Sequence, residues 1–566
     1  MSQQFNEVKV GNTSRSTFDL SHHQVTTSDF GYLIPICVRD MVPNDDFVVK
    51  PNLFCRLAPL ALPTYGKITC RVHSFFVPYR LLYPHWNEFI TQSSSNNTIP
   101  PFFTVSVLRQ ALNADPQFGS GTDLPRGIYG RVMANLGINP ELIMNTSGLS
   151  PNDRISAFRW LAYYRIWLDW FMDSNINDHS AMVADFNDVI KDGGSMIARA
   201  TDFLRYRCAC FGKDYFTTAK LHPQSSVDPS RVGVDIASSL NPGLANPSNA
   251  TNIQLTHEGN VRAISASGQN NIVGEFTVEE LRAAVSLQRY LERNNYVGTK
   301  VINQLLAHFG IAPTPERLDM SEYIGGSNFG VQIGDVTSTT PNPYTTVSLG
   351  AQAGKGIAAS QTETVRYHAK EHGVFMTLLS ILPDTAYYQG IPKVMQLGVT
   401  GDPLDFYTPE FENLGFQEIL NKEVYVPRVG DEGDYNSYDP EGIFGYAPRY
   451  AFLKWQQDIL AGDMLGFSSA QPMFANNHAW HLFRTLYFDE ENPLVLNDNF
   501  VECDNHNTDY DRVFQITIND YDHFYFNIDV DVKATRPMVG FAEPTLDSVS
   551  AEDGNKINLP YGGTRL

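Results

Sequence analysis

The chain has 566 residues, of which 42% are hydrophobic, 12% aromatic and 18% charged, and its formal net charge is −21. This length allows several domains, or one domain with long insertions. A surface this acidic repels nucleic acid at long range, so any such contact has to be local or bridged by a basic partner or cations. Few charges among many aromatic residues are typical of chains that bury surface against other subunits, although one very large core has a similar composition.

The cysteine spacing and the hydropathy give no sign of a secreted or membrane protein. The cysteines are Cys37, Cys55, Cys70, Cys208, Cys210 and Cys503. Their spacing matches neither a disulfide framework nor a zinc site. The polar start lacks the apolar stretch of a signal peptide, and the longest apolar runs are about half of a membrane span. We therefore expect a soluble protein in a reducing cytoplasm.

The first 150 residues predict an arm, strands and loops in that order. Residues 1–30 carry little hydrophobic pattern and predict an extended arm. Strands follow, and in "KITCRVHSFF" Ile68, Cys70 and Val72 point to one side. Residues 91–150 are rich in Ser, Asn, Pro and Gly, which favours loops.

The stretch "SPNDRISAFRWLAYYRIWLDWFMD", residues 150–173, predicts a helix with Ser150 as N-cap and Asp153 completing a capping box. The predicted apolar stripe consists of Ala157, Trp160, Leu161, Tyr164, Trp167, Leu168 and Phe171. Arginines beside these aromatic residues could stack on bases. A core helix with flanking arginines is the simpler interpretation.

Residues 225–275 form a long polar excursion, a kind of segment that is usually functional or mobile. Thr277 and Glu280 then predict the start of a second helix, and a short helix after it ends at Gly310. In the last third, "HFYFNIDVDVK" alternates as a strand with one buried face. Strands at both ends of the chain, with helices and loops between them, predict a mainly β fold of the β-sandwich type.

One motif matches a class of zinc peptidase. His368, Glu371 and His372 have the His-x-x-Glu-His spacing that would bind zinc on a helix. The apolar run that follows predicts a buried strand instead, in which residues four apart are about 13 Å from each other and cannot share a metal. We therefore assign no catalytic or metal-binding role to these residues and keep a zinc-dependent hydrolase only as an alternative function.

Two acidic patterns have an alternative and a simpler interpretation. Asp529 and Asp531 share a strand face and could suit glycoside hydrolysis, but a solvated face is the simpler interpretation. The acidic loop at 430–442 could hold a divalent cation such as calcium, but it lacks EF-hand spacing, and a solvated loop is again simpler. "GAQAGKG", residues 350–356, lacks the spacing of a phosphate loop.

Eight stretches, in a consistent order from about residue 75 to residue 538, together resemble the major capsid protein of the microviruses, which are small tailless icosahedral single-stranded DNA phages. They are "FFVPYRLLYPHWNEFIT", "YYRIWLDWFMDSN", "KDYFTTAKLHPQ", "LQRYLERNNYVGTKVINQLLAHFG", "RLDMSEYIGGS", "EHGVFMTLLSILP", "GYAPRYAFLKWQQD" and "DVKATRPM". The resemblance is to a gokushovirus-like or related branch.

The resemblance implies an eight-stranded antiparallel jelly roll in one domain over residues 31–566. The implied insertions lie at about 91–215, 225–275 and 276–310. It also implies a T=1 shell of sixty copies around a circular single-stranded DNA genome. The implied partners are a small basic DNA-binding protein, a pilot or minor capsid protein and a host surface receptor, with no membrane and no cofactor. The protein would belong to the virion and assemble in the host bacterial cytoplasm. The alternatives to a capsid protein are the zinc-dependent hydrolase and a glycan-binding β-sandwich.

Candidate site residues follow from residue type and position. Arg15, Arg159 and Arg165 are candidate contacts to DNA on the inner surface. Residues 225–275 are the candidate surface protrusion that touches the receptor. The arm at 1–30, which contains Arg15, His22 and His23, is a candidate tether to a neighbouring subunit or to the genome.

Overall fold

The structure is a computed structural model. It describes residues 15–91, 99–114, 127–145, 147–196, 200–224, 250–255, 261–265, 272–274, 278–298, 300–312, 314–337, 352–399, 401–427, 438–465, 480–486, 494–503, 510–516 and 521–538. Residues 1–14 of the predicted arm, most of 225–275 and residues 430–437 of the acidic loop lie outside these ranges.

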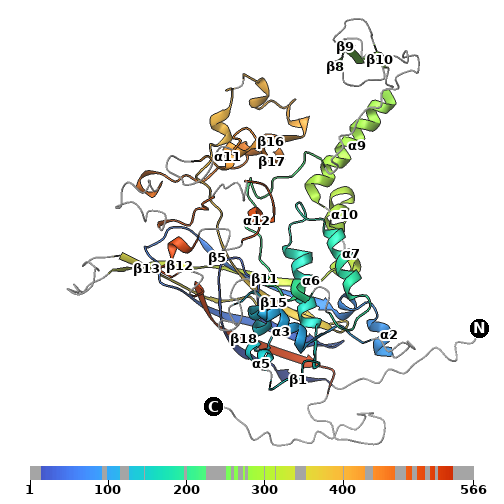
Figure 1. The fold of residues 1–566 in the computed structure, drawn as a ribbon, viewed down its shortest axis with the longest axis vertical. Helices are drawn as coiled ribbons and strands as arrows, with labels where there is room; N and C mark the ends of the chain where they lie inside the picture. The colour runs from blue at the N-terminus through green and yellow to red at the C-terminus, as the bar shows by residue number, and fades with distance from the viewer. Residues whose placement is uncertain are drawn as a thin grey trace, which may run out of the picture.

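Two antiparallel sheets form the body of the molecule (Figure 1). In the larger sheet the described strands follow the order β1-β18-β4-β13-β12, while β2 also pairs with β18 and β14 with β4. Their bounds are β1 Ser16–Asp19, β2 His22–Ser28, β4 Asp46–Leu57, β12 Gln332–Thr337, β13 Gln352–Gln361, β14 Val365–His368 and β18 Phe524–Arg536. The alternation predicted for β18 is confirmed, because Phe524, Phe526, Ile528, Val530 and Val532 are all buried.

The second sheet has the order β11-β5-β15-β3. Its strands are β3 Ile34–Met41, β5 Ile68–Pro78, β11 Glu322–Gly330 and β15 Gly373–Pro383. β15 lies between β5 and β3 and is buried along its whole length, which explains its mainly apolar sequence. Side chains from both sheets and from the covering helices belong to one hydrophobic core.

The strand count differs from the simple jelly roll. Within the described residues the two sheets contain seven and four strands. The excess arises because short strands share the edges of long ones: β1 and β2 pair with successive parts of β18, and β14 and β13 with successive parts of β4. The coarse prediction, mainly antiparallel β structure with helical insertions, is confirmed.

The predicted arm is part of the sheet where the structure describes it. β1 and β2 both pair with β18, so a domain boundary at residue 30 is wrong. These edge strands contribute backbone hydrogen bonds while their side chains alternate between half-buried and exposed. Their sequence therefore carries no strong hydrophobic pattern.

Helices cover the second sheet and form about half of the described residues in the segment predicted as loops. Among residues 79–204 the helices are α1 Tyr79–Leu82, α2 Trp86–Thr91, α3 Val105–Asn113, α4 Ile128–Asn135, α5 Pro140–Met144, α6 Phe158–Ile166, a π-helical turn Trp167–Phe171, α7 His179–Ile190 and α8 Ala200–Leu204. The loop prediction for 91–150 is wrong because α3 to α5 are short and separated by polar stretches that dominate the composition.

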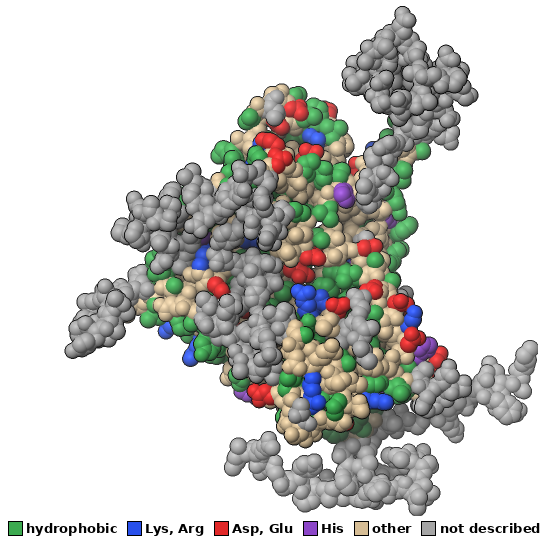
Figure 2. Space-filling model, viewed as in Figure 1, with side chains coloured by type: hydrophobic (Ala, Val, Ile, Leu, Met, Phe, Trp, Pro, Cys, Tyr) green, Lys and Arg blue, Asp and Glu red, His purple; other side chains and the backbone are tan. Residues whose placement is uncertain are grey.

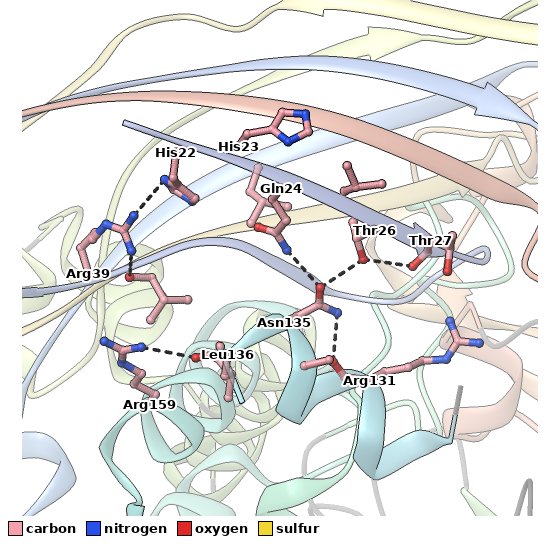
Figure 3. A pocket seen from close by; sticks show the side chains of 15 residues that line it. His22, His23, Gln24, Thr26, Thr27, Arg39, Arg131, Asn135, Leu136 and Arg159 are labelled. Carbon is pink, nitrogen blue, oxygen red and sulfur yellow. Dashed lines mark hydrogen bonds between the residues drawn. The ribbon is translucent and has the colours of Figure 1, made fainter. Parts of the chain in front are cut away.

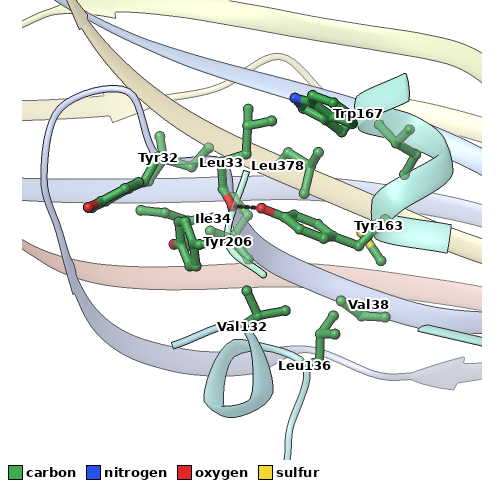
Figure 4. Packing of buried hydrophobic residues seen from close by; sticks show 14 of the residues in the cluster. Tyr32, Leu33, Ile34, Val38, Val132, Leu136, Tyr163, Trp167, Tyr206 and Leu378 are labelled. Carbon is green, nitrogen blue, oxygen red and sulfur yellow. Dashed lines mark hydrogen bonds between the residues drawn. The ribbon is translucent and has the colours of Figure 1, made fainter. Parts of the chain in front are cut away.

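Helix α6 begins later than predicted. Ser150 N donates to Asp153 Oδ2 at 2.9 Å, as in a capping box, but this bond closes a turn. Residues Arg154–Ser156 then form β7, which pairs with β6 (Phe102–Thr104). Tyr163, outside the predicted stripe, is fully buried, and its hydroxyl donates to the Leu33 carbonyl at 3.0 Å (Figure 4). Residues 160–166 of the helix are all buried because it lies inside the core, whereas Phe158 and Arg159 at its start are half-buried.

Two further parts extend from the body (Figure 1). One is a helical hairpin of α9 Val278–Val297 and α10 Val301–Phe309, which confirms the second predicted helix and its stop at Gly310 in a left-handed conformation. The small sheet β8 Ala250–Leu255, β9 Val261–Ser265 and β10 Ile272–Gly274 lies at its far end. The other part contains β16 Phe416–Leu420, α11 Asn421–Val424, β17 Ile443–Pro448 and α12 Asp498–Val501, around a core of its own.

Candidate nucleic-acid interface

The side chains of the His-x-x-Glu-His motif make separate contacts. The motif runs from the end of β14 to the start of β15, which belong to different sheets, so its prediction as the interior of one strand is wrong. His368 Nδ1 is 2.6 Å from Asp46 Oδ1, and Glu371 accepts from Arg80 Nε at 3.0 Å. The His372 ring packs edge-on against Trp86, with ring centroids 5.7 Å apart. No group of three potential metal ligands occurs within the described residues.

The acidic patterns are solvated where the structure describes them. Asp529 lies 3.9 Å from His23 Nε2, and Asp531 accepts from Asn52 at 3.1 Å, both on the exposed face of β18. In the described part of the acidic loop, Glu441 pairs with Lys422 at 2.5 Å.

Each of the three candidate arginines makes an internal contact. Arg15 pairs with Asp46 and donates to the Asn44 carbonyl at 2.7 Å. Burial opposes ionisation of Asp46, but hydrogen bonds from His368 and Arg15 hold the pKa of Asp46 below its usual value. Arg165 is 2% exposed and donates to Asp169 at 3.0 Å. A buried side chain cannot reach a nucleic acid, so the prediction for Arg165 is wrong.

Arg159 lies at the rim of a hollow of about 510 Å³ between β2, β3 and α4 (Figure 3). We call this the basic hollow. Its lining consists of His22, His23, Gln24, Val25, Thr26, Thr27, Ile36, Val38, Arg39, Arg131, Ala134, Asn135, Leu136, Gly137 and Arg159. Among these described lining residues none is acidic. The hollow therefore concentrates cationic groups on a chain whose net charge is strongly negative.

The charges of the three arginines are compensated to different degrees. Arg159 donates to Asp40 at 2.7 Å, and Arg131 donates to Asp522 at 2.8 Å. Arg39 donates to His22 Nδ1 at 2.9 Å and to the carbonyls of Leu20 and Val38. Within the part of the chain that the structure describes, Arg39 makes no ion pair. Its charge is available to an anion.

The imidazole of His22 is held neutral beside this guanidinium. Burial lowers the pKa of His22, and the positive charge of Arg39 lowers it further. A neutral imidazole accepts the Arg39 hydrogen bond and so orients the guanidinium toward the hollow (Figure 3).

Amide and hydroxyl groups form the other side of the hollow. Asn135 Oδ1 accepts from Gln24 Nε2 and from Thr26 Oγ1, each at 3.1 Å, while Asn135 Nδ2 donates to the Arg131 carbonyl (Figure 3). These groups can bind phosphate oxygens or base edges, whereas the described lining contains no Phe, Tyr or Trp on which a base could stack. The arrangement suits contact with a phosphate backbone.

Sequence reasoning missed most of this site. Arg39 follows five consecutive buried residues in β3, and Arg131 and Asn135 lie in α4, which was predicted as a loop. The charged residue at the end of this buried run could have indicated that Arg39 leaves the core. The grouping with α4 depends on tertiary structure.

The comparisons with known proteins agree with one another. The family described as "Capsid protein (F protein)" matches residues 6–546. The chain belongs to this capsid protein family. Similar proteins are the "Capsid protein VP1" of Bdellovibrio phage phiMH2K, 26% identical over 95% of this chain and 97% of its own, and that of Chlamydia phage 1, 25% identical over 96% and 98%. That of Spiroplasma virus 4 is 23% identical over 81% and 84%.

Membership of the capsid protein family confirms the predicted resemblance to microvirus capsid proteins and makes this chain a structural protein of a virus particle. The zinc hydrolase and the glycan-binding alternatives are set aside by the same finding. Within the described residues, the capsid protein has no helix that is long and apolar enough to cross a membrane.

Proposed function

We propose that sixty copies of the chain close into a T=1 icosahedral shell around a circular single-stranded DNA genome. The match to the capsid family over residues 6–546 carries this proposal. Closed shells require subunit contacts whose rotations close around symmetry axes rather than continue as a filament. The exposed apolar side chains of the α9–α10 hairpin, at the upper right in Figure 2, offer such a contact. They include Leu281, Val285, Leu287, Tyr290, Tyr296, Val301, Leu306, Phe309 and Ile311.

The sandwich itself is proposed to be a jelly roll with divided strands. We count β1 and β2 as one divided strand beside β18, and β14 and β13 as one divided strand beside β4. The larger sheet then has four strand positions, with β12 as an extra strand at its edge. Together with the four strands of the second sheet, this pattern agrees with a jelly roll extended at one edge.

The basic hollow is proposed to hold a phosphate of the genome on the inner surface. Arg39 supplies a charge without an acidic partner among the described residues, and Arg159 lies on the rim. Because the chain has a net charge of −21, such contacts are local, and a small basic viral protein would neutralise the rest of the genome. Arg15 is a weaker candidate because Asp46 already pairs with it.

The substitution Arg39→Gln tests the DNA contact. We expect a smaller amount of ordered DNA in filled particles. For binding of a single-stranded oligonucleotide, we expect the magnitude of the slope of log affinity against log salt concentration to decrease by about 0.7. Arg282→Gln, on the exposed face of α9, is the matched control. Equal salt slopes for the wild-type protein and Arg39→Gln would reject the hollow as a phosphate site, while assembly into empty shells would still support the structural function.

The outer surface is proposed to include residues 225–275, of which the structure describes β8 to β10 at the far end of the hairpin. In Figure 1 the described strands β8 to β10 lie at the opposite end of the long axis from β1 and β18. If the hollow faces the genome, this segment projects outward and contacts the host receptor. Limited proteolysis of intact particles tests the placement, because cleavage within 225–275 is expected and complete protection would contradict it.

The other partners follow from the shell. We propose a pilot or minor capsid protein as a further component of the virion, and assembly in the host bacterial cytoplasm before release. A divalent cation at residues 430–442 stays a proposal, which elemental analysis of purified particles checks.

A further inference from the structure

A second cavity, of about 390 Å³, lies at the base of the helical hairpin. We call it the lysine pocket. It is lined by Arg71, His73, Trp170, Phe171, Met172, Asp173, Ser174, Asn175, Ala209, Cys210, Phe211, Gly212, Lys213, Lys300, Asn303, Ser380 and Leu382. Strands β5 and β15 form its floor, the end of the π-helical turn and residues 209–213 form its sides, and the start of α10 closes it. The pocket therefore joins the sandwich to the hairpin.

The lysine pocket contains an excess of cations. Arg71, Lys213 and Lys300 line it, and Asp173 is the single carboxylate among the described lining residues. Lys220, beside the pocket, donates to Asn175 Oδ1 and to the Tyr296 carbonyl. None of these four cations makes an ion pair with a described residue. Lys300 Nζ instead donates to the Asp169 carbonyl at 2.6 Å.

Burial weakens the protonation of two of these lysines. Burial lowers the pKa of Lys220 to about 8, with Asp173 opposing and Lys213 adding to the effect. Burial also lowers the pKa of Lys300, while the negative charges of Asp169 and Asp173 oppose this effect and Lys213 adds to it. The folded protein thus holds neighbouring positive charges away from water at a cost that a bound anion would offset.

The remaining lining can hold the body of a ligand. Trp170 is 36% exposed and lies near Phe171, while Asn175 and Asn303 supply amide groups. Trp170 Nε1 donates to Ser321 at 3.0 Å, which fixes the ring at the wall of the pocket. The cavity is far larger than one water molecule, whose share of liquid volume is about 30 Å³, and it is polar on several sides.

We propose that the lysine pocket binds a compact polyanion, a small molecule with two or more phosphate groups, and that this ligand ties the hairpin to the sandwich. With Lys220 beside the pocket, four cations stand against one carboxylate; this excess is larger than the charge of a single phosphate monoester, and a polyphosphate can meet it from several directions. The contacts come from β5, from residues 209–213 and from α10, so a bound polyanion would link three separate segments.

The ligand would fix the angle of the hairpin and with it the apolar face that the hairpin offers to neighbouring copies. The proposal goes beyond the DNA contact, because the pocket shares no lining residue with the basic hollow. A bound polyanion would therefore favour one geometry of assembly.

Titration of sodium tripolyphosphate into the purified full-length chain tests the proposal. We expect one site per chain, with binding weakened at least tenfold by Lys213→Gln and by Arg71→Gln. Both side chains lie at the pocket, and neither makes a hydrogen bond or ion pair with another described residue. Lys191→Gln, at the exposed end of α7, is the control and should bind as the wild type does. Hydrogen exchange in residues 278–312 should slow when tripolyphosphate binds.

Three results would overturn the proposal. The first is equal affinity of the wild type and both pocket variants for tripolyphosphate. The second is that inorganic phosphate binds as tightly as tripolyphosphate. The third is that a single-stranded oligonucleotide displaces tripolyphosphate with equal affinity per phosphate. The last would make the pocket a second DNA contact. Loss of binding in Arg39→Gln instead would place the anion in the basic hollow. None of these results bears on whether the chain assembles into shells.

Discussion

Arg131 in α4 and Asp522, two residues before β18, form a buried ion pair across 391 positions of the sequence. Their side chains are 7% and 3% exposed, and Arg131 Nη1 donates to Asp522 Oδ2 at 2.8 Å. Thr27 in β2 also donates to Asp522. One carboxylate thus joins the helical insertion, an N-terminal edge strand and the C-terminal strand of the sandwich.

Loss of one partner should be costly because it leaves a buried charge. We expect Arg131→Met to lower the free energy of unfolding by about 3–5 kcal/mol, and the double variant Arg131→Met/Asp522→Leu to recover part of the loss. Urea unfolding of the unassembled chain measures both. Lys191→Gln, which removes an exposed pair, should leave the midpoint unchanged. Equal stability of Arg131→Met and wild type would contradict a structural role for the pair.

Gly31 should not tolerate a side chain. Its φ is +81°, and a Cβ there would lie 1.5 Å from the Cys503 carbonyl oxygen. Backbone strain alone costs about 1–3 kcal/mol, so Gly31→Ala should unfold at clearly lower urea concentration than the wild type. Gly334→Ala is the matched control, because no atom lies within 4 Å of the added Cβ. A normal midpoint for Gly31→Ala would show that the turn can rearrange.

The buried pair of His523 and Asp29 should make stability depend on pH. Burial opposes the charged imidazole, but the hydrogen bond and the negative charge of Asp29, with Nδ1 and Oδ2 2.8 Å apart, raise the pKa of His523 above its usual 6.5. Asp511 raises the pKa of His523 further. The stabilisation is therefore complete below pH 6.5 and is lost as the pH rises through the folded-state value.

Burial and the negative charge of Asp522 raise the pKa of Asp29, and His523 opposes this shift. Like the shift of His523, a raised folded-state pKa of Asp29 makes the protein less stable as the pH increases. We expect urea midpoints to decrease from pH 6 to pH 8 in the wild type and to vary less in His523→Gln. His222→Gln, at an exposed position, should keep the wild-type profile. Identical profiles for His523→Gln and the wild type would reject the ion pair as the cause.

The hairpin should matter for assembly rather than for folding. Leu306 and Phe309 in α10 are 55% and 72% exposed, so serine substitutions remove little buried surface from the isolated chain. We expect Leu306→Ser/Phe309→Ser to retain the wild-type urea midpoint but to yield at least tenfold fewer particles on a sucrose gradient. Arg282→Gln in α9 should assemble normally. Normal particle yield from the double variant would exclude this face as a subunit contact.

The local sequence was sufficient to predict those helices and strands whose burial pattern or ends are visible in consecutive residues. The alternation of β18, the apolar run of β15 and the caps and stop of the α9–α10 hairpin all predict elements that the structure contains. A strand buried on one face shows alternating apolar residues, and a strand buried on both faces shows an apolar run. A helix end is marked by capping residues or by Gly. The eight ordered stretches were sufficient for the capsid family.

Tertiary structure alone decided what depends on distant partners. β1 and β2 exist as strands because β18, about 500 positions away, offers them a free edge, and backbone pairing needs no apolar side chains. The His-x-x-Glu-His motif is divided between two sheets, and Arg39 meets Asn135 and Arg159 only because α4 and α6 pack near β3. Backbone pairing and charge compensation depend on neighbours in space. The sequence therefore determined the elements with a local pattern and the family, whereas the packing determined the edge strands, the hollow and the pocket.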